Sequence, residues 1–295
     1  MRALRVLAVT LVLLIALAGV LIASVTRDSP ARVALGEPRH ITSDDARIEY
    51  FVAGPTRGET VVLLPSYARS VSDLNELATA LHGSGYHTVA VQPRGVDGST
   101  LPSTDITLHT LARDVVAVLD HEGLREPVHV IGHAYGNRIA RTLATDHPGR
   151  VGALVLLAAG GVEPTPPETG RAISCALFRI GWACAQEDST RFAFFAGASE
   201  IPDYWLRGWY PRAGIAQARA MVNTHPDEWS AGGSAPILVL DPAEDAAAPG
   251  GGTLLEKEHP DRVKLVVIPD AGHALLPEQP EAVAREAVAF LGSFR

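Results

Sequence analysis

The stretch "VIGHAYGNRIA", residues 130–140, joins two patterns of side chains. An apolar, β-branched run ends at Gly132, and apolar side chains at helical spacing follow Gly136. This order predicts a buried strand, a tight turn and a helix. Ala134 lies at the middle of the turn, at the start of the helix. Its methyl group has no nucleophilic atom, which raises the question of what chemistry such a turn could support.

The rest of the chain repeats the alternation of strand and helix. Strands are predicted at 47–54, 60–65, 87–93, 127–132, 151–161, 235–241 and 262–270, and helices at 73–85, 107–123, 134–149 and 277–294. Short continuous apolar runs between amphipathic helices are typical of a parallel sheet covered on both faces. The sequence therefore predicts an α/β fold with a mostly parallel central sheet flanked by helices.

Residues 162–232 interrupt this alternation. They hold both cysteines of the chain and the tryptophans Trp182, Trp205, Trp209 and Trp229. We expect a helical lid insertion over the carboxyl-terminal edge of the sheet, where open α/β sheets bind ligands. The tryptophans either line a pocket there or pack the insertion's own small core.

The two cysteines, Cys175 and Cys184, are nine residues apart. On one straight helix they would be about 13.5 Å apart, which is too far for a disulfide. A bend at Gly181 would allow the bond to form in an oxidising compartment. A Cys175–Cys184 disulfide and two buried thiols therefore both remain open.

The charge balance argues against one class of partner. The 295 residues include 25 basic and 33 acidic side chains, and the formal net charge is −8. No run of Lys or Arg stands out beyond the extreme N-terminus, so binding to nucleic acid is not expected. No Cys/His cluster has the spacing of a zinc site, and no metal or organic cofactor is implied.

The N-terminal segment is separate from the fold. Residues 6–25 carry no charge and follow Arg2 and Arg5. A helix of this length spans about 30 Å, the thickness of the hydrocarbon core of a bilayer. Residues 1–25 are either a signal peptide, with a cleavage site at Ala16-Leu17-Ala18, or a transmembrane anchor.

Both interpretations place the body outside the cytoplasm, secreted or held at the cell membrane through its N-terminal segment. Residues 26–45 then form a polar linker. The domain itself occupies residues 46–295.

Four landmarks follow one another in a recognisable order. They are "LLPSYARSVSDLNELATAL" at 63–81, "VQPRGVDGST" at 91–100, the turn around Ala134, and a late pair of segments, "VLDPAEDAAAP" at 239–249 and "IPDAGHALLPEQP" at 268–280. In this order they resemble the α/β-hydrolase superfamily, whose fold carries a lid insertion in many members. The resemblance covers residues 46–295.

The resemblance implies roles for the first three landmarks. The backbone N–H groups of Tyr67 and Tyr135 would form the oxyanion hole, and Ala134 occupies the place of the nucleophile. Pro65 and Ser66 depart from the His-Gly pair of most relatives. In the second landmark Gln92 stands in an Asp position, and Arg94 and Gly95 are expected to be structural.

The fourth landmark implies an acid and a base. By the register of Pro249 the acid is Asp245, with Glu244 and Asp241 as neighbours that could be confused with it. His273 is the base, oriented by Asp245. His133 and Tyr135 are weaker candidates, for direct contact between their side chains and a ligand. Ser66 is the weakest candidate, as a displaced nucleophile.

Three functions are compatible with these residues. The first is a hydrolase-like enzyme in which the His273–Asp245 dyad activates a water or abstracts a substrate proton. The second is a catalytically inactive, ligand-binding member of the fold. The third is a serine hydrolase whose serine has been replaced by Ala134. The expected ligand is a small apolar or ester-like molecule.

Overall fold

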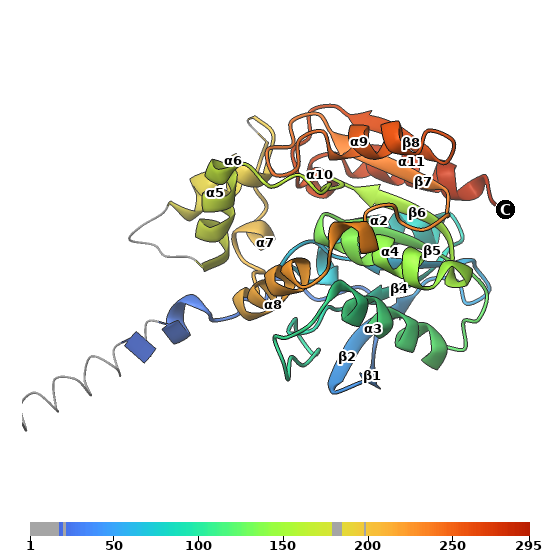
Figure 1. The fold of residues 1–295 in the computed structure, drawn as a ribbon, viewed down its shortest axis with the longest axis horizontal. Coiled ribbons are helices and arrows are strands. Elements are labelled where there is room, and N and C mark those ends of the chain that lie inside the picture. The colour runs from blue at the N-terminus through green and yellow to red at the C-terminus, as the bar shows by residue number, and fades with distance from the viewer. Residues whose placement is uncertain (1–17, 20–21, 179–184, 198) are drawn as a thin grey trace, which may run out of the picture.

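The computed structural model describes residues 18–19, 22–178, 185–197 and 199–295. Its centre is an eight-stranded sheet with the order β1-β2-β4-β3-β5-β6-β7-β8 (Figure 1). The strands are β1 (Glu37–Ser43), β2 (Ala46–Ala53), β3 (Thr60–Leu64), β4 (His87–Val91), β5 (Val128–His133), β6 (Val151–Leu157), β7 (Ile237–Pro242) and β8 (Val263–Ile268). β1 pairs with β2, and β2 with β4, in antiparallel fashion, and the other pairs are parallel. The predicted mostly parallel sheet is confirmed.

Helices cover both faces of this sheet. One core cluster joins the sheet to α3 (Leu108–His121), α4 (Tyr135–Asp146) and α9 (Gly251–Glu258). A second cluster joins the opposite face to α2 (Asn75–Gly83), α10 (Leu275–Glu278) and α11 (Pro280–Gly292). Short 3-10 helices lie at η1 (Val71–Leu74), η2 (Pro148–Arg150) and η3 (Pro226–Glu228).

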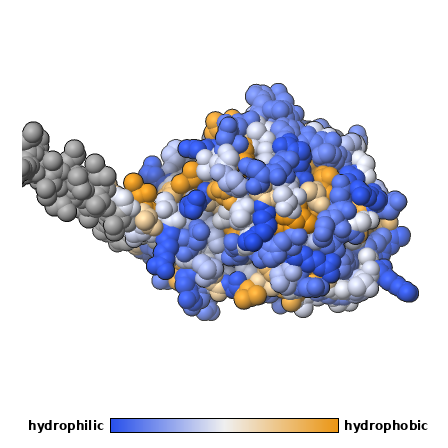
Figure 2. Space-filling view, turned by 90° about the horizontal axis from the view of Figure 1, so that it is seen from below, coloured by the Kyte–Doolittle hydropathy of each residue, from blue (hydrophilic) through white to orange (hydrophobic). Residues whose placement is uncertain are grey.

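The apolar side chains are concentrated in these clusters. On β5 successive residues serve opposite clusters, with Val130 in the first and Ile131 in the second. On the face seen in Figure 2, hydrophilic residues predominate and hydrophobic ones form small groups. The continuous apolar run of β5 thus reflects burial on both sides, as in other parallel sheets.

Four α-helices lie in the described part of the segment between β6 and β7 (Figure 1). They are α5 (Pro167–Phe178), α6 (Gln186–Phe194), α7 (Asp203–Leu206) and α8 (Pro211–Val222). Trp205 and Trp209 are buried in an aromatic cluster with Phe194 and Phe195. Trp229 is also buried, on α4's side of the sheet. The three described tryptophans therefore pack cores, and Trp182 lies outside the described residues.

The predicted linker 26–45 contains β1, which the sequence analysis missed. β1 is an edge strand with one covered face, where Ile41 and Ser43 are buried while Glu37 and Thr42 are exposed. Its polar composition therefore resembles that of a linker. Upstream, the N–H of Ser29 donates to the carbonyl of Trp209 at 3.0 Å, so this segment also contacts the insertion.

Two other predictions concern segments that the structure describes only in part. Most of the apolar run 6–25 lies outside the described residues, and so does Cys184. Within the described part of the chain, no helix is both long enough and apolar enough to cross a membrane. The signal peptide or anchor and the disulfide stay predictions.

Candidate active site

The turn around Ala134 connects β5 to α4 in a left-handed conformation. Ala134 has φ 49° and ψ −105°, and its N–H donates to the carbonyl of Leu157 at 2.8 Å. A side chain other than glycine in this region costs of order 1–3 kcal/mol and persists only where its surroundings enforce it. The neighbouring strand and helix therefore hold Ala134 in a shape that the methyl group alone does not favour.

The glycines on either side allow this turn to be tight. A Cβ at Gly132 would lie 2.5 Å from the backbone carbon of Gly136, and one at Gly136 would lie 2.7 Å from the carbonyl oxygen of Pro65. Both distances are shorter than real contacts permit. The turn therefore packs directly against the loop after β3, which carries Ser66 and Tyr67.

His273 and Asp245 meet at the same edge of the sheet, after β8 and β7. The Nδ1 of His273 lies 2.9 and 3.0 Å from the two carboxylate oxygens of Asp245. The N–H groups of Ala247 and Ala248 donate to the same carboxylate at 2.8 and 2.9 Å. Burial alone would raise the pKa of Asp245, but His273 and these hydrogen bonds hold it below its usual value. Asp245 is thus an ionised acceptor that orients the imidazole ring.

The two neighbouring acids do not hold His273. Glu244 is exposed, and its N–H donates to the carbonyl of Ala271. Asp241 is buried near Asp245, and its Oδ1 has no hydrogen-bond partner among the described residues. Burial, and then the charge of Asp245, raise the pKa of Asp241 to about 6. The structure thus brings together the acid and the base that the sequence indicated.

His133 does not line the cavity but contacts the loop that carries His273. It is fully buried, and its Nε2 lies 2.8 Å from the backbone carbonyl oxygen of His273. Burial lowers the pKa of His133 to about 3, so the ring is neutral and donates through Nε2 to this carbonyl. His133 therefore fixes the loop that carries His273.

The two expected oxyanion donors come from separate segments, because Tyr135 directly follows Ala134 while Tyr67 lies in the loop after β3. Among the described residues, neither the N–H of Tyr67 nor that of Tyr135 donates to another protein group. The phenol rings of these tyrosines are tilted at 54° to each other, with centroids 6.0 Å apart. Burial raises the pKa of Tyr67 to about 12, so its side chain is a neutral phenol.

The insertion fixes the loop of Tyr67. Gln217 on α8 accepts a hydrogen bond from the N–H of Ala68 at 2.7 Å, and its backbone carbonyl accepts one from the Tyr135 hydroxyl at 3.1 Å. Because Gln217 accepts hydrogen bonds from both the loop of Tyr67 and α4, it connects the two segments that carry the expected oxyanion donors. Gln217 was not predicted as a site residue, since no local sequence pattern marks it.

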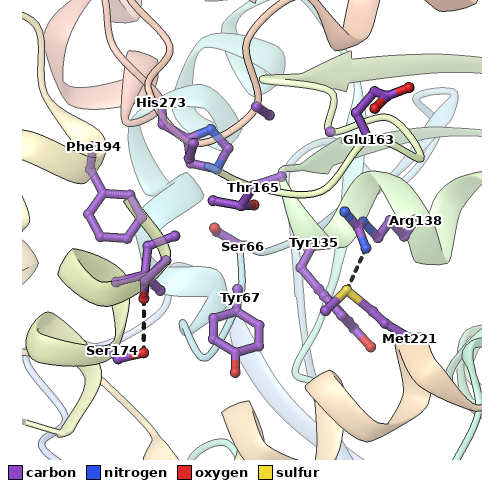
Figure 3. Close-up of a pocket in the computed structure, with 16 residues that line it drawn as sticks. Ser66, Tyr67, Tyr135, Arg138, Glu163, Thr165, Ser174, Phe194, Met221 and His273 are labelled. Atoms are coloured by element: carbon purple, nitrogen blue, oxygen red, sulfur yellow. Dashed lines mark hydrogen bonds between the residues drawn. The ribbon is translucent and has the colours of Figure 1, made fainter. Parts of the chain in front are cut away.

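A cavity of about 280 Å³ lies above the turn (Figure 3). Its lining combines the core domain and the insertion. The described residues that line it are Ser66, Tyr67, Ala134, Tyr135, Arg138, Gly160, Glu163, Thr165, Gly170, Ile173, Ser174, Phe194, Met221, Ala247, Ala248 and His273. Ala134 and His273 thus share one cavity, and none of the described tryptophans lines it.

The described residues contain no cluster of three or more His, Cys, Asp or Glu side chains that could hold a metal ion. The charged and polar side chains that line the cavity are therefore not grouped as metal ligands among those residues. The landmark residue Arg94 is part of the frame instead, where its guanidinium pairs with Asp114 at 2.8 Å.

Comparison with known proteins decides the family. A model described as "Alpha/beta hydrolase family" matches residues 61–286. The chain belongs to the alpha/beta hydrolase family. This confirms the resemblance that the four landmarks indicated.

Two curated relatives show local similarity to this chain. Non-heme chloroperoxidase of Streptomyces lividans is 37% identical over 119 residues, which are 40% of this chain and 43% of that protein. Epoxide hydrolase B of Mycobacterium tuberculosis is 36% identical over 116 residues, 37% of this chain and 32% of that protein. The match to this chain therefore spans less than half the length of these relatives.

A solved structure shows similarity over a greater length. The crystal structure of a hydrolase from Pseudomonas aeruginosa has a TM-score of 0.72 and 22% identity, and the match covers 88% of this chain and 99% of that one. At this identity the similarity establishes the fold alone. The printed names of the two curated relatives denote different reactions.

Proposed function

We propose that this protein is a hydrolase-like enzyme that uses the His273–Asp245 dyad without a covalent serine intermediate. The observation that carries the proposal is that His273, held by Asp245 through Nδ1, lines the same cavity as Ala134. An oriented imidazole whose other nitrogen is available in a cavity is the arrangement of a general base.

In the proposed reaction the base acts on water. The methyl group of Ala134 leaves the room that a serine hydroxyl would fill. A water in this position gives a proton to Nε2 of His273 while its oxygen bonds to the carbonyl carbon of an ester. The developing oxyanion accepts hydrogen bonds from the N–H groups of Tyr67 and Tyr135. His273 then returns the proton to the leaving oxygen as the C–O bond breaks.

The insertion 162–232 serves as the lid of this site in the proposal. Support comes from Phe194, whose ring lies 6.0 Å from that of His273 and whose carbonyl accepts a hydrogen bond from the N–H of Ala274 at 2.7 Å. A lid attached to the base loop would limit the access of bulk water. The proposed location outside the cytoplasm rests on the apolar run 6–25 alone.

The experiment is a panel of p-nitrophenyl esters assayed with the wild type, His273→Ala and His225→Ala. His225 is exposed on the surface and controls for nonspecific hydrolysis by imidazole groups. Loss of a general base is expected to reduce the rate by about 100-fold or more, and His225→Ala should leave it unchanged.

One alternative function is kept because Ala134 cannot attack a substrate. If the wild type hydrolyses no ester faster than His273→Ala, while both proteins are folded, the proposal of an enzyme acting on esters is wrong. A ligand-binding member of the family would then take its place.

A further inference from the structure

Arg138 shares the cavity with the proposed catalytic residues. It lies on α4 four residues after Ala134. Helix geometry places it about 6 Å further along the axis on the same face, and helical side chains lean toward the N-terminus of their helix. Figure 3 shows the Arg138 guanidinium and the His273 ring on opposite sides of the cavity.

The charge of Arg138 has no acidic partner among the described residues. Its guanidinium donates to the Sδ of Met221 and lies 5.3 Å from the ring centre of Trp229. Neither of these groups is an anion. Burial lowers the pKa of Arg138, as expected where no carboxylate compensates for lost hydration.

Glu163 also lines the cavity, but it is exposed. Within the described residues no ion pair joins it to Arg138. The guanidinium group has five N–H donors. Since only Met221 receives a hydrogen bond from it among the described residues, most of these donors remain available to a ligand.

Two other buried arginines differ from Arg138 in this respect. Arg141 donates to the carbonyls of Gly160 at 2.6 Å and Ser230 at 3.0 Å. Arg69 binds the carboxylate of Asp73 at 2.7 Å. Each donates to a carbonyl or carboxylate of the protein, so an arginine without such an acceptor is not a general feature of this fold.

We propose that Arg138 binds the carboxylate of a small ligand whose reacting carbon lies above Ala134. This inference rests on the proposed function and names its substrate class, a short ester or acyl compound that bears a carboxylate. A guanidinium matches a carboxylate with two parallel hydrogen bonds. The volume of about 280 Å³ limits the ligand to a small molecule. The offset of about 6 Å along α4 between Ala134 and Arg138 separates the charge of the ligand from its reacting carbon by a few bonds.

The test measures binding, so it does not require turnover. Hexanoate and its neutral isostere hexanamide are titrated by calorimetry into the wild type, Arg138→Gln, Arg138→Lys and Arg285→Gln. Arg285 is exposed on α11 outside the cavity, so its replacement removes the same charge without touching the site.

We expect the wild type and Arg285→Gln to bind hexanoate at least tenfold more tightly than hexanamide. Arg138→Gln should lose this preference, and Arg138→Lys should retain part of it. Equal binding of the two probes by the wild type, or an unchanged preference in Arg138→Gln, would overturn the proposal. If carboxylate binding behaves as expected but no ester is hydrolysed, the proposed catalysis fails and the ligand class stands.

Discussion

Ala134 keeps a left-handed backbone, with φ 49°, although its side chain brings no reactive atom. This backbone conformation is held by the close packing at Gly132 and Gly136 and by the hydrogen bond from the Ala134 N–H to Leu157. None of these contacts involves the Ala134 side chain. The N–H of Tyr135 directly follows this turn, and that of Tyr67 lies in the loop after β3, against which the turn packs. The proposed oxyanion hole therefore consists of backbone groups and does not depend on the side chain at position 134.

The two acids beside His273 predict opposite responses to pH. The pKa of Asp241 is raised to about 6, mainly by burial, so ionisation destabilises the fold as pH rises from its usual pKa toward 6. Asp241→Asn should therefore be more stable than the wild type, by a margin that is larger at pH 8 than at pH 5. Urea unfolding at the two pH values measures this margin.

Asp245 provides the matched control. Its pKa is lowered, so the carboxylate stabilises the fold above its usual pKa, and this contribution is lost as pH falls through the lowered value. Asp245→Asn should therefore be less stable than the wild type at pH 8. A margin for Asp241→Asn that is the same at both pH values would show that Asp241 is not buried as an uncompensated charge.

At the scale of elements, the insertion is attached to the core by a buried arginine. Arg69, two residues after Tyr67, binds Asp73 and also donates to the backbone carbonyls of Tyr204 and Arg207, each at 2.8 Å. Its guanidinium lies 4.5 Å from the ring centre of Trp205 on α7. One side chain thus links the proposed oxyanion loop to the insertion.

Arg69→Met should lower the free energy of unfolding by about 3–5 kcal/mol, because it leaves the carboxylate of Asp73 buried without a partner. Replacing both residues, as Arg69→Met with Asp73→Leu, should recover part of the loss. Denaturant titration of the three proteins measures it. A cost below about 1 kcal/mol for the single change would mean that the ion pair does not hold the insertion.

The elements that the sequence predicted are those with strong local patterns. β1 was not predicted because an edge strand with one covered face keeps mostly polar side chains. α9 was not predicted because it is short and starts with Gly251 and Gly252, which are poor helix formers. Both misses leave the central parallel strands, and hence the position of the site, unchanged.

At the scale of the whole molecule, a site residue could be predicted where a local sequence pattern marks it. It could not be predicted where only contacts between segments distant in sequence place it. Asp245 and His273 could be predicted because each lies in a short segment with its own pattern after a strand. Gln217 could not, because it joins the site only when α8 packs over α4. The fold placed the local motifs together, and the insertion added residues that no motif marks.

The most direct test of the account is the time course of p-nitrophenol release with enzyme near stoichiometric concentration. If His273 activates water, the wild type should release product linearly from the start, since no acyl group accumulates on the protein. Ala134→Ser, which restores a hydroxyl beside His273, should give an initial burst that approaches one equivalent, and His273→Ala should release nothing above background. A burst from the wild type would contradict the account, because it would require a covalent nucleophile elsewhere in the cavity, such as Ser66.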